Sequence, residues 1–151
     1  MRGPRLSCMI SRVASIYKDA RIDVNPDDAW DALRDFGALH ERLAAGFVTE
    51  TRLEGDDRIV TFFNGSVMRE RLVSVDDEAR RLVWSIVDGP YTHHNGSAQI
   101  FCDCDRRTWF VWVADVLPDE LAPGTAEMME RGLVAIKETL ERAAGATSEA
   151  A

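Results

Sequence analysis

Glu70 is the side chain of this sequence best suited to chemistry, because it is a carboxylate within an alternating and largely apolar segment. Residues that alternate along a strand point to opposite faces, so Met68, Glu70 and Leu72 share one face. The opposite register would bury Arg69 and Arg71 close together, which costs more free energy than burying one carboxylate. We therefore expect Glu70 to point into the interior.

A carboxylate in an apolar cavity loses hydration, and this desolvation raises its pKa. With a raised pKa, Glu70 can act as a general acid or base, or it can orient a hydroxyl of a ligand. The alternative is that Glu70 pairs with an arginine or with buried water and only holds its strand in place.

Histidines are the second candidates, because they titrate near neutral pH and can move protons. His93 and His94 follow a turn at the expected mouth of the cavity, and they point in opposite directions if they lie in a strand. His94 shares its parity with Ala98 and Ile100, so we expect His94 to face inward; the alternative is an exposed loop pair. His40 can approach the same mouth, although a surface position on a helix is the better interpretation.

Two of the three cysteines, Cys102 and Cys104, lie one residue apart and share a strand face. Structural zinc sites use two spaced pairs of ligands, and a second pair is missing here. We therefore expect no metal and interpret these cysteines as small core residues at a strand end. The sequence also has no nucleophile-elbow, P-loop or dinucleotide motif, so triad hydrolases and nucleotide enzymes have no support.

The elements that position these side chains begin with a strand predicted over residues 13–24. A helix follows this strand: Asn25 can cap it, and Pro26 suits its first turn. Gly37 is expected to end that helix, and a second short helix is predicted over residues 38–43.

Alternating apolar residues then predict six more strands, over residues 47–54, 58–63, 66–75, 81–87, 94–103 and 107–117. Between two of them, Asn64 and Gly65 predict a two-residue hairpin in which both residues have positive φ. Consecutive strands joined by short turns form an antiparallel sheet.

The last predicted element is a long amphipathic helix from residue 120 or 125 to residue 143, and Gly132 on its apolar stripe permits close approach of the sheet. The sequence therefore predicts an α+β fold with a curved, seven-stranded antiparallel sheet around a long C-terminal helix. Two short helices follow the first strand. A strongly curved sheet around one helix leaves space for a ligand.

One domain over residues 12–144 is expected, with a loose leader over 1–11 and a disordered tail over 145–151. The net charge of −8 repels phosphate backbones and anionic headgroups, so nucleic acid and membrane surfaces are not expected partners. No apolar run approaches the ~20 residues of a membrane helix. The odd number of cysteines favours a cytoplasmic protein. The sequence does not decide between a monomer and a homodimer.

Several local strings, in this order, resemble the SRPBCC superfamily, also called START-like or polyketide cyclase/dehydratase-like proteins. They are Asn25-Pro26-Asp27-Asp28-Ala29-Trp30, Arg69-Glu70-Arg71-Leu72 followed by Asp76-Asp77, Leu82-Val83-Trp84-Ser85-Ile86, and Trp112-Val113-Ala114-Asp115. The resemblance covers about residues 13–143. It implies a helix-grip fold, a deep cavity, an inward glutamate at a position such as Glu70, and binding of lipids, hormones, polyketides or other hydrophobic molecules. Only some members of the superfamily are enzymes.

Strand alternation and the resemblance together predict a set of residues that face the ligand. They are Phe36, Phe63, Met68, Glu70, Leu72, Trp84, Ile86, His94, Ala98, Ile100, Trp112, Met129 and Leu133. Ordinary core packing is the alternative for each apolar member alone. In the last strand both faces are apolar, so the choice of Trp112 over Trp109 stays open.

The predicted function is binding of a small hydrophobic molecule, such as a lipid, polyketide or aromatic compound, in an internal cavity without a cofactor. The alternative is a cyclase or dehydratase that acts on a polyketide-like or aromatic substrate. In that case Glu70 and His94 are the expected acid and base.

Overall fold

A computed structural model describes residues 13–149 of the chain. Its elements, in order, are β1 (Ser15–Ile22), α1 (Pro26–Arg34), η1 (Leu39–Leu43), β2 (Val48–Glu54), β3 (Asp57–Phe62), β4 (Val67–Asp76), β5 (Arg81–Ile86), β6 (His93–Cys102), β7 (Thr108–Leu117), η2 (Asp119–Leu121) and α2 (Ala122–Glu149). All the predicted strands and helices are present in the predicted order, and the short 3-10 helix η2 is an addition that the sequence did not predict.

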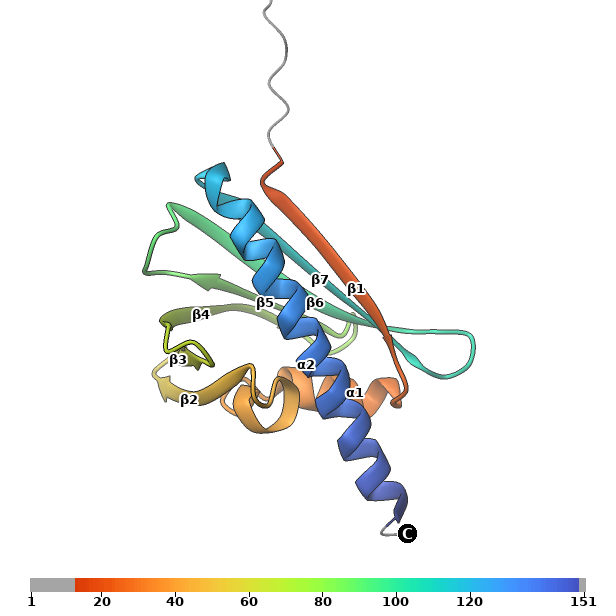
Figure 1. Cartoon of the computed structure of the whole chain (residues 1–151). Helices are drawn as coiled ribbons and strands as arrows, with labels where there is room; N and C mark the ends of the chain where they lie inside the picture. Colours follow the sequence, from red (N-terminus) through yellow and green to blue (C-terminus); the bar gives the residue numbers. More distant parts are fainter. Residues whose placement is uncertain (1–12, 150–151) are drawn as a thin grey trace, which may run out of the picture.

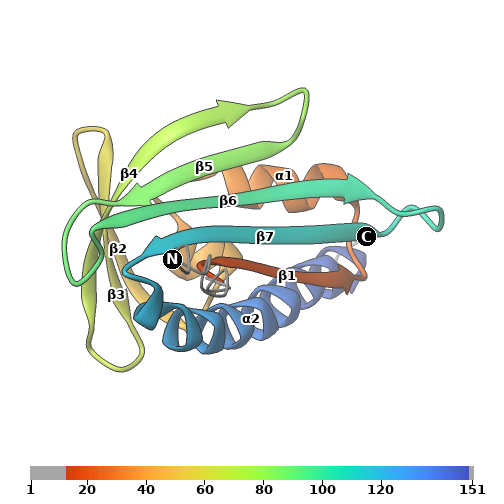
Figure 2. The same cartoon turned by 90° about the horizontal axis from the view of Figure 1, so that it is seen from above.

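The seven strands form one antiparallel sheet in the order β1-β7-β6-β5-β4-β3-β2. Only the pairing of β1 with β7 joins distant parts of the sequence; the other neighbours are consecutive hairpins. The sheet curves so that β2 and β3 turn away from β6 and β7, while α2 crosses its concave side next to β1 (Figures 1 and 2). This arrangement is the predicted α+β helix-grip fold.

Helix α1 starts as its sequence predicts. The side chain of Asn25 accepts a hydrogen bond from the backbone N–H of Asp27 at 2.8 Å, and Pro26 occupies the first turn. Trp30 and Leu33 are buried on one stripe of the helix. The helix therefore closes one end of the concave face.

The β3–β4 hairpin differs from the predicted two-residue turn. Gly65 N–H donates to the Phe62 carbonyl at 2.9 Å, and Phe62 N–H donates to the Ser66 carbonyl at 2.8 Å, so the loop has three residues. Gly65 has φ of +85°, whereas Asn64 keeps a negative φ. The longer loop shifts the pairing of the two strands by one residue relative to the predicted turn.

Helix α2 packs its apolar stripe onto the sheet, and Gly132 permits the close approach that the sequence predicted. A Cβ atom at Gly132 would lie 2.9 Å from the Trp112 ring and 3.0 Å from the Phe47 ring. The predicted end of the helix at Ala143 is wrong, because α2 continues to Glu149. The segment 145–149, expected to be disordered, is helical; the predicted leader over 1–11 lies outside the described residues.

Candidate ligand-binding site

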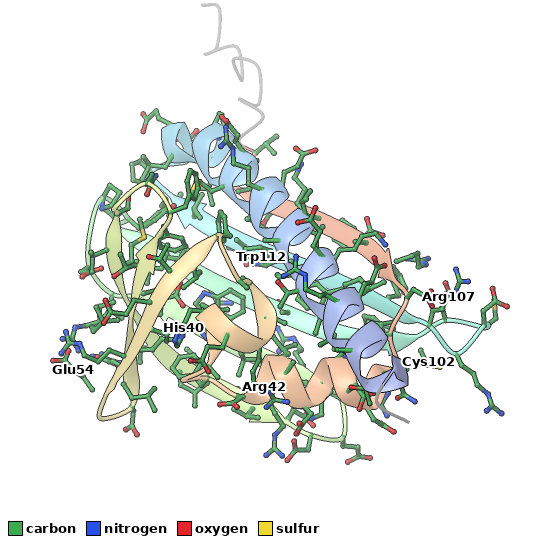
Figure 3. The ribbon with its side chains drawn as sticks, turned by 60° about the horizontal axis from the view of Figure 1, so that its bottom comes forward. His40, Arg42, Glu54, Cys102, Arg107 and Trp112 are labelled. Carbon is green, nitrogen blue, oxygen red and sulfur yellow. The ribbon has the colours of Figure 1, made fainter. Side chains whose placement is uncertain are left out.

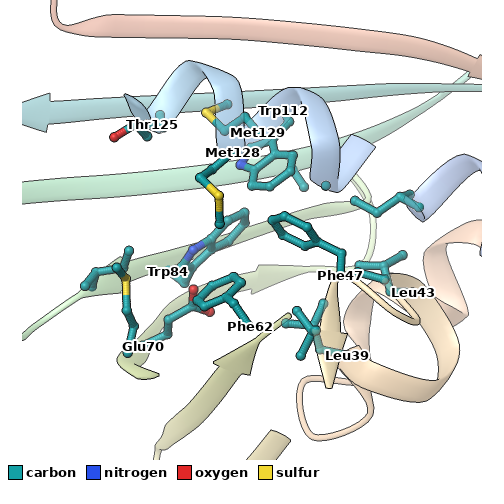
Figure 4. A pocket seen from close by; sticks show the side chains of 18 of the residues that line it. Leu39, Leu43, Phe47, Phe62, Glu70, Trp84, Trp112, Thr125, Met128 and Met129 are labelled. Atoms are coloured by element: carbon teal, nitrogen blue, oxygen red, sulfur yellow. The ribbon is translucent and has the colours of Figure 1, made fainter. Parts of the chain in front are cut away.

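A cavity of about 210 Å³ lies between the concave face of the sheet, η1 and α2. Its wall is mainly apolar and rich in aromatic, methionine and leucine side chains (Figure 4). Phe47 and Phe62 meet edge to face with ring centroids 5.4 Å apart, and the rings of Trp84 and Trp112 lie 6.2 Å apart. This composition suits a predominantly apolar guest.

Many of the residues predicted to face a ligand line this cavity. They are Met68, Glu70, Trp84, Ile86, His94, Ala98, Trp112 and Met129. The choice of Trp112 over Trp109 is also settled, because the Trp109 side chain instead donates from Nε1 to Asp19 on the outer face at 2.8 Å. Contact of these residues with a ligand stays a prediction.

Two aromatic rings predicted to close the cavity do not line it. Phe63 belongs to the β3–β4 loop and is 45% exposed, because the strand ends at Phe62 and its alternation no longer applies. Phe36 follows the end of α1, and its ring covers the guanidinium of Arg58 at 4.1 Å. Phe36 therefore supports a wall residue without lining the cavity itself.

Three aliphatic residues of the predicted wall also lie elsewhere. Ile100 and Leu133 are buried in the hydrophobic core but do not line the cavity. Leu72 packs against the same core next to a bulge between Leu72 and Ser74, which interrupts the alternation of β4. Strand and helix periodicity predicted the face on which these residues lie, but not whether they reach the cavity.

Glu70 points inward as predicted, and its partner is Arg58 from the neighbouring strand. Nε of Arg58 donates to Oε2 of Glu70 at 2.7 Å, and Nη2 lies 2.7 Å from the same oxygen. Nη1 of Arg58 donates to the Phe36 carbonyl at 3.2 Å. The carboxylate lies beside Trp84 and Phe62 in the cavity wall (Figure 4). Pairing with an arginine was the alternative to a catalytic role.

The outer face of the same strands carries a separate ionic network. Arg69 and Arg71 both donate to the carboxylate of Asp57, at 3.0 and 2.9 Å for the shortest contact of each. The hydrogen bonds from Arg71 and Arg69 hold the pKa of Asp57 below its ordinary value. The predicted facing of β4, with Glu70 inside and both arginines outside, is therefore confirmed.

His94 is buried and lines the cavity, whereas His93 is exposed, as the parity of β6 predicted. Nδ1 of His94 accepts a hydrogen bond from the backbone N–H of Ile86 at 3.1 Å. Burial, together with the nearby His93, lowers the pKa of His94 to about 4, and Asp115 opposes this only in part. His94 is therefore neutral near pH 7, with its proton on Nε2.

Two hydroxyls lie next to His94 in the wall. The ring of Tyr91 meets the His94 ring edge to face, with centroids 5.2 Å apart. The hydroxyls of Tyr91 and Thr125 lie 2.7 Å apart, and Thr125 donates to the Leu121 carbonyl at 2.8 Å. Tyr91 is therefore the donor to Thr125, and this pair ties the β5–β6 connection to the start of α2.

The remaining candidates do not join the cavity wall. Cys102 and Cys104 are exposed around the β6–β7 hairpin, so their interpretation as core residues is wrong. Figure 3 shows Cys102 on the same side of the molecule as the hairpin residue Arg107. Alternation assigns a side chain to one face of a strand, but it does not predict whether a residue at the strand end is buried. His40 lies on η1 with its Nε2 3.4 Å from Glu41. Within residues 13–149, no three His, Cys, Asp or Glu side chains group as metal ligands.

The sequence did not predict several wall residues. Arg58 was overlooked because its side depends on the register of the β3–β4 hairpin, and the leucines of η1 were overlooked because five residues show no helical period. Met128 and Gly132 on α2 carried a signal, since they flank the predicted Met129 on the apolar stripe.

No helix within the described residues is long and apolar enough to cross a membrane. A family model described as polyketide cyclase / dehydrase and lipid transport matches residues 13–145. No curated protein matches the sequence.

Solved structures share the fold. The protein XoxI from Bacillus cereus superposes with a TM-score of 0.75 at 20% identity, covering 85% of this chain and 96% of its own. A solution structure from Thermobifida fusca gives 0.69 at 27% identity, with 86% and 95% covered. A START superfamily protein from Mycobacterium smegmatis gives 0.68 at 12% identity, with 88% and 98% covered.

Proposed function

Because this chain belongs to the polyketide cyclase/dehydrase and lipid transport family, we propose that it binds a small, predominantly apolar molecule in the cavity beneath α2. The family itself suggests hydrophobic ligand binding. The observation that carries the proposal is the wall, in which apolar side chains, many of them aromatic or methionine, surround a few polar groups. The buried ones are Arg58 with Glu70 and His94 next to Tyr91, and the polar loop residues Asn64 and Ser66 also line the cavity.

The size of the cavity supports a compact guest. An apolar cavity of about 150 Å³ in another protein holds one benzene molecule, and this cavity has about 210 Å³. Methionines such as Met128 and Met129 can change rotamer at low cost and so adapt the wall to different shapes. A molecule with two fused rings is a suitable first probe.

Acid–base catalysis by Glu70 and His94 is the alternative, because both side chains line the same cavity. Two contacts weaken it. Oε2 of Glu70 is held by Arg58, and Nδ1 of His94 already accepts the Ile86 N–H. With a pKa of about 4, His94 is also a weak base near neutral pH. Binding without turnover is therefore the better-supported function.

The experiment that tests binding combines extraction and titration. Native mass spectrometry of protein purified from cells is expected to show a co-purified hydrophobic molecule. Added 2-ethylnaphthalene is expected to stabilise the protein by about 2.7 kcal/mol at one hundred times its Kd. A protein that is always empty, and that no apolar compound stabilises, contradicts the proposal.

Matched variants locate the binding in this cavity. Ala98→Leu adds bulk to the wall and is expected to abolish the stabilisation by 2-ethylnaphthalene. Ser97→Leu places a leucine on the opposite face of β6 and is expected to leave the stabilisation unchanged. Glu70→Gln distinguishes binding alone from acid–base catalysis. Lost turnover with retained ligand affinity favours an enzyme, whereas unchanged turnover and affinity remove Glu70 from any mechanism.

A further inference from the structure

His94 presents a single hydrogen-bond donor to the cavity. Its Nδ1 accepts the Ile86 N–H at 3.1 Å, which leaves the proton of the neutral ring on Nε2. Nε2 makes no hydrogen bond within residues 13–149. It is not among the fully buried side-chain polar atoms that lack a partner, so part of its surface is accessible. Because His94 lines the cavity, this N–H opens onto the space that a ligand would occupy.

The described wall of the cavity contains no uncompensated positive charge. Arg58 is the only arginine or lysine among the lining residues of the described chain, and it is 4% exposed. Two of its nitrogens lie 2.7 Å from Glu70 Oε2, and the third donates to the Phe36 carbonyl. Its charge is therefore already compensated by Glu70.

From these two observations we infer that the cavity selects an uncharged molecule that carries a hydrogen-bond acceptor, such as a carbonyl or an ether, directed at His94 Nε2. The same wall rejects carboxylates of equal size, fatty-acid anions included. This inference rests on the proposed function, because it describes the ligand of the same cavity.

The physical reason is the cost of removing charge from water. A carboxylate that enters an apolar cavity without a free counter-charge loses several kcal/mol of hydration. A neutral carbonyl loses far less, and one hydrogen bond from His94 returns much of it.

Three naphthalenes that differ only at one substituent test the inference. The probes are 2-ethylnaphthalene, 2-acetylnaphthalene and 2-naphthoate, titrated at pH 8 and followed by calorimetry and by the fluorescence of the wall residues Trp84 and Trp112. We expect 2-acetylnaphthalene to bind about 3–10-fold more tightly than 2-ethylnaphthalene, as one neutral hydrogen bond provides. We expect 2-naphthoate to bind at least about 100-fold more weakly than the ketone.

Variants assign the preference to His94. His94→Phe keeps a ring but removes the donor, so the two neutral probes should bind equally. His94→Gln keeps an N–H donor and should retain part of the preference, and it serves if the Phe variant does not fold. His93→Phe changes the exposed neighbour and should keep the full preference. A two-bond proton–nitrogen correlation spectrum should show protonated Nε2 and unprotonated Nδ1 on His94.

The outcomes separate the two claims. If no naphthalene binds, the proposed function fails. If 2-ethylnaphthalene binds but 2-naphthoate binds as well as the ketone, the proposed function stands and this inference is wrong. A preference for the ketone that survives in His94→Phe also overturns the inference.

Discussion

Arg58 and Glu70 face each other across the β3–β4 ladder, and both Nε and Nη2 of the arginine lie 2.7 Å from the same carboxylate oxygen. Glu70 is 5% exposed, so the pair has almost no water to replace a lost partner. Removal of one member of a buried pair leaves an uncompensated charge, which costs more than the pair itself contributes. The two strands and the cavity wall therefore depend on the pair as a unit.

Glu70→Leu is expected to lower the free energy of unfolding by about 3–5 kcal/mol, because Arg58 keeps its charge in the interior. Adding Arg58→Met to that variant should recover most of the loss, since no charge then remains buried. Urea denaturation of the single and double variants measures both effects. Arg52→Met, at an exposed pair with Glu54, is the control and should cost less than ~1 kcal/mol. Additive single losses would contradict the coupling.

The partner of Glu70 could not be predicted from the sequence pattern, because it depends on the register of β3 against β4. Alternation predicted the inward face of β4, because one face carries two arginines and the other carries one carboxylate. The predicted two-residue turn would have placed Ile59, not Arg58, opposite Glu70. The observed three-residue loop shifts the ladder by one residue, and a shift of one residue exchanges the two faces of β3 relative to β4.

The sequence also did not predict which inward-facing side chains line the cavity and which lie in the core. Ala98 and Ile100 share one face of β6, yet Ala98 lines the cavity and Ile100 is a core residue that does not line it. Period-two alternation assigns a face, whereas the position of a cavity along that face depends on how far the sheet curves and where the helices lie. The fold, which follows from element order, was therefore predicted more completely than the site.

His94 predicts a dependence of stability on pH. Its pKa is about 4 in the folded chain and about 6.5 when unfolded, so the unfolded state takes up the proton first as the pH falls. The contribution is fully present above pH 6.5 and is lost as the pH falls toward 4. The loss is on the order of 3 kcal/mol. Denaturation curves measured between pH 7 and pH 4 report it.

Three charged or titratable groups determine this window: His94 itself, His93, which repels the imidazolium, and Asp115, which attracts it. His94→Gln should flatten the dependence between pH 6.5 and 4. His93→Gln should keep most of it, because burial is the main cause of the low pKa. An equally steep loss of stability in His94→Gln would assign the dependence to other groups.

Gly132→Ala should destabilise the protein although alanine favours helices. The added methyl group would lie 2.9 Å from Trp112 and 3.0 Å from Phe47, and overpacking of this kind costs about 1–3 kcal/mol. Gly145→Ala is the control on the same helix: nothing lies within 4 Å, so it should gain up to ~1 kcal/mol. Thermal unfolding measures both, and a shift of the same sign for the two variants would show that Gly132 has room.

Gly96→Ala should change the cavity through the indole of Trp84. A Cβ atom at Gly96 would lie 2.7 Å from the Trp84 ring, so the ring must move, and one side of it faces the cavity. We expect the affinity for 2-ethylnaphthalene to fall about tenfold, with a modest loss of stability. Ser97→Ala removes an atom on the opposite face of β6 and should leave the affinity unchanged. Calorimetric titration of the two variants measures the difference. Equal affinities would place the ligand away from Trp84 and contradict binding in this cavity.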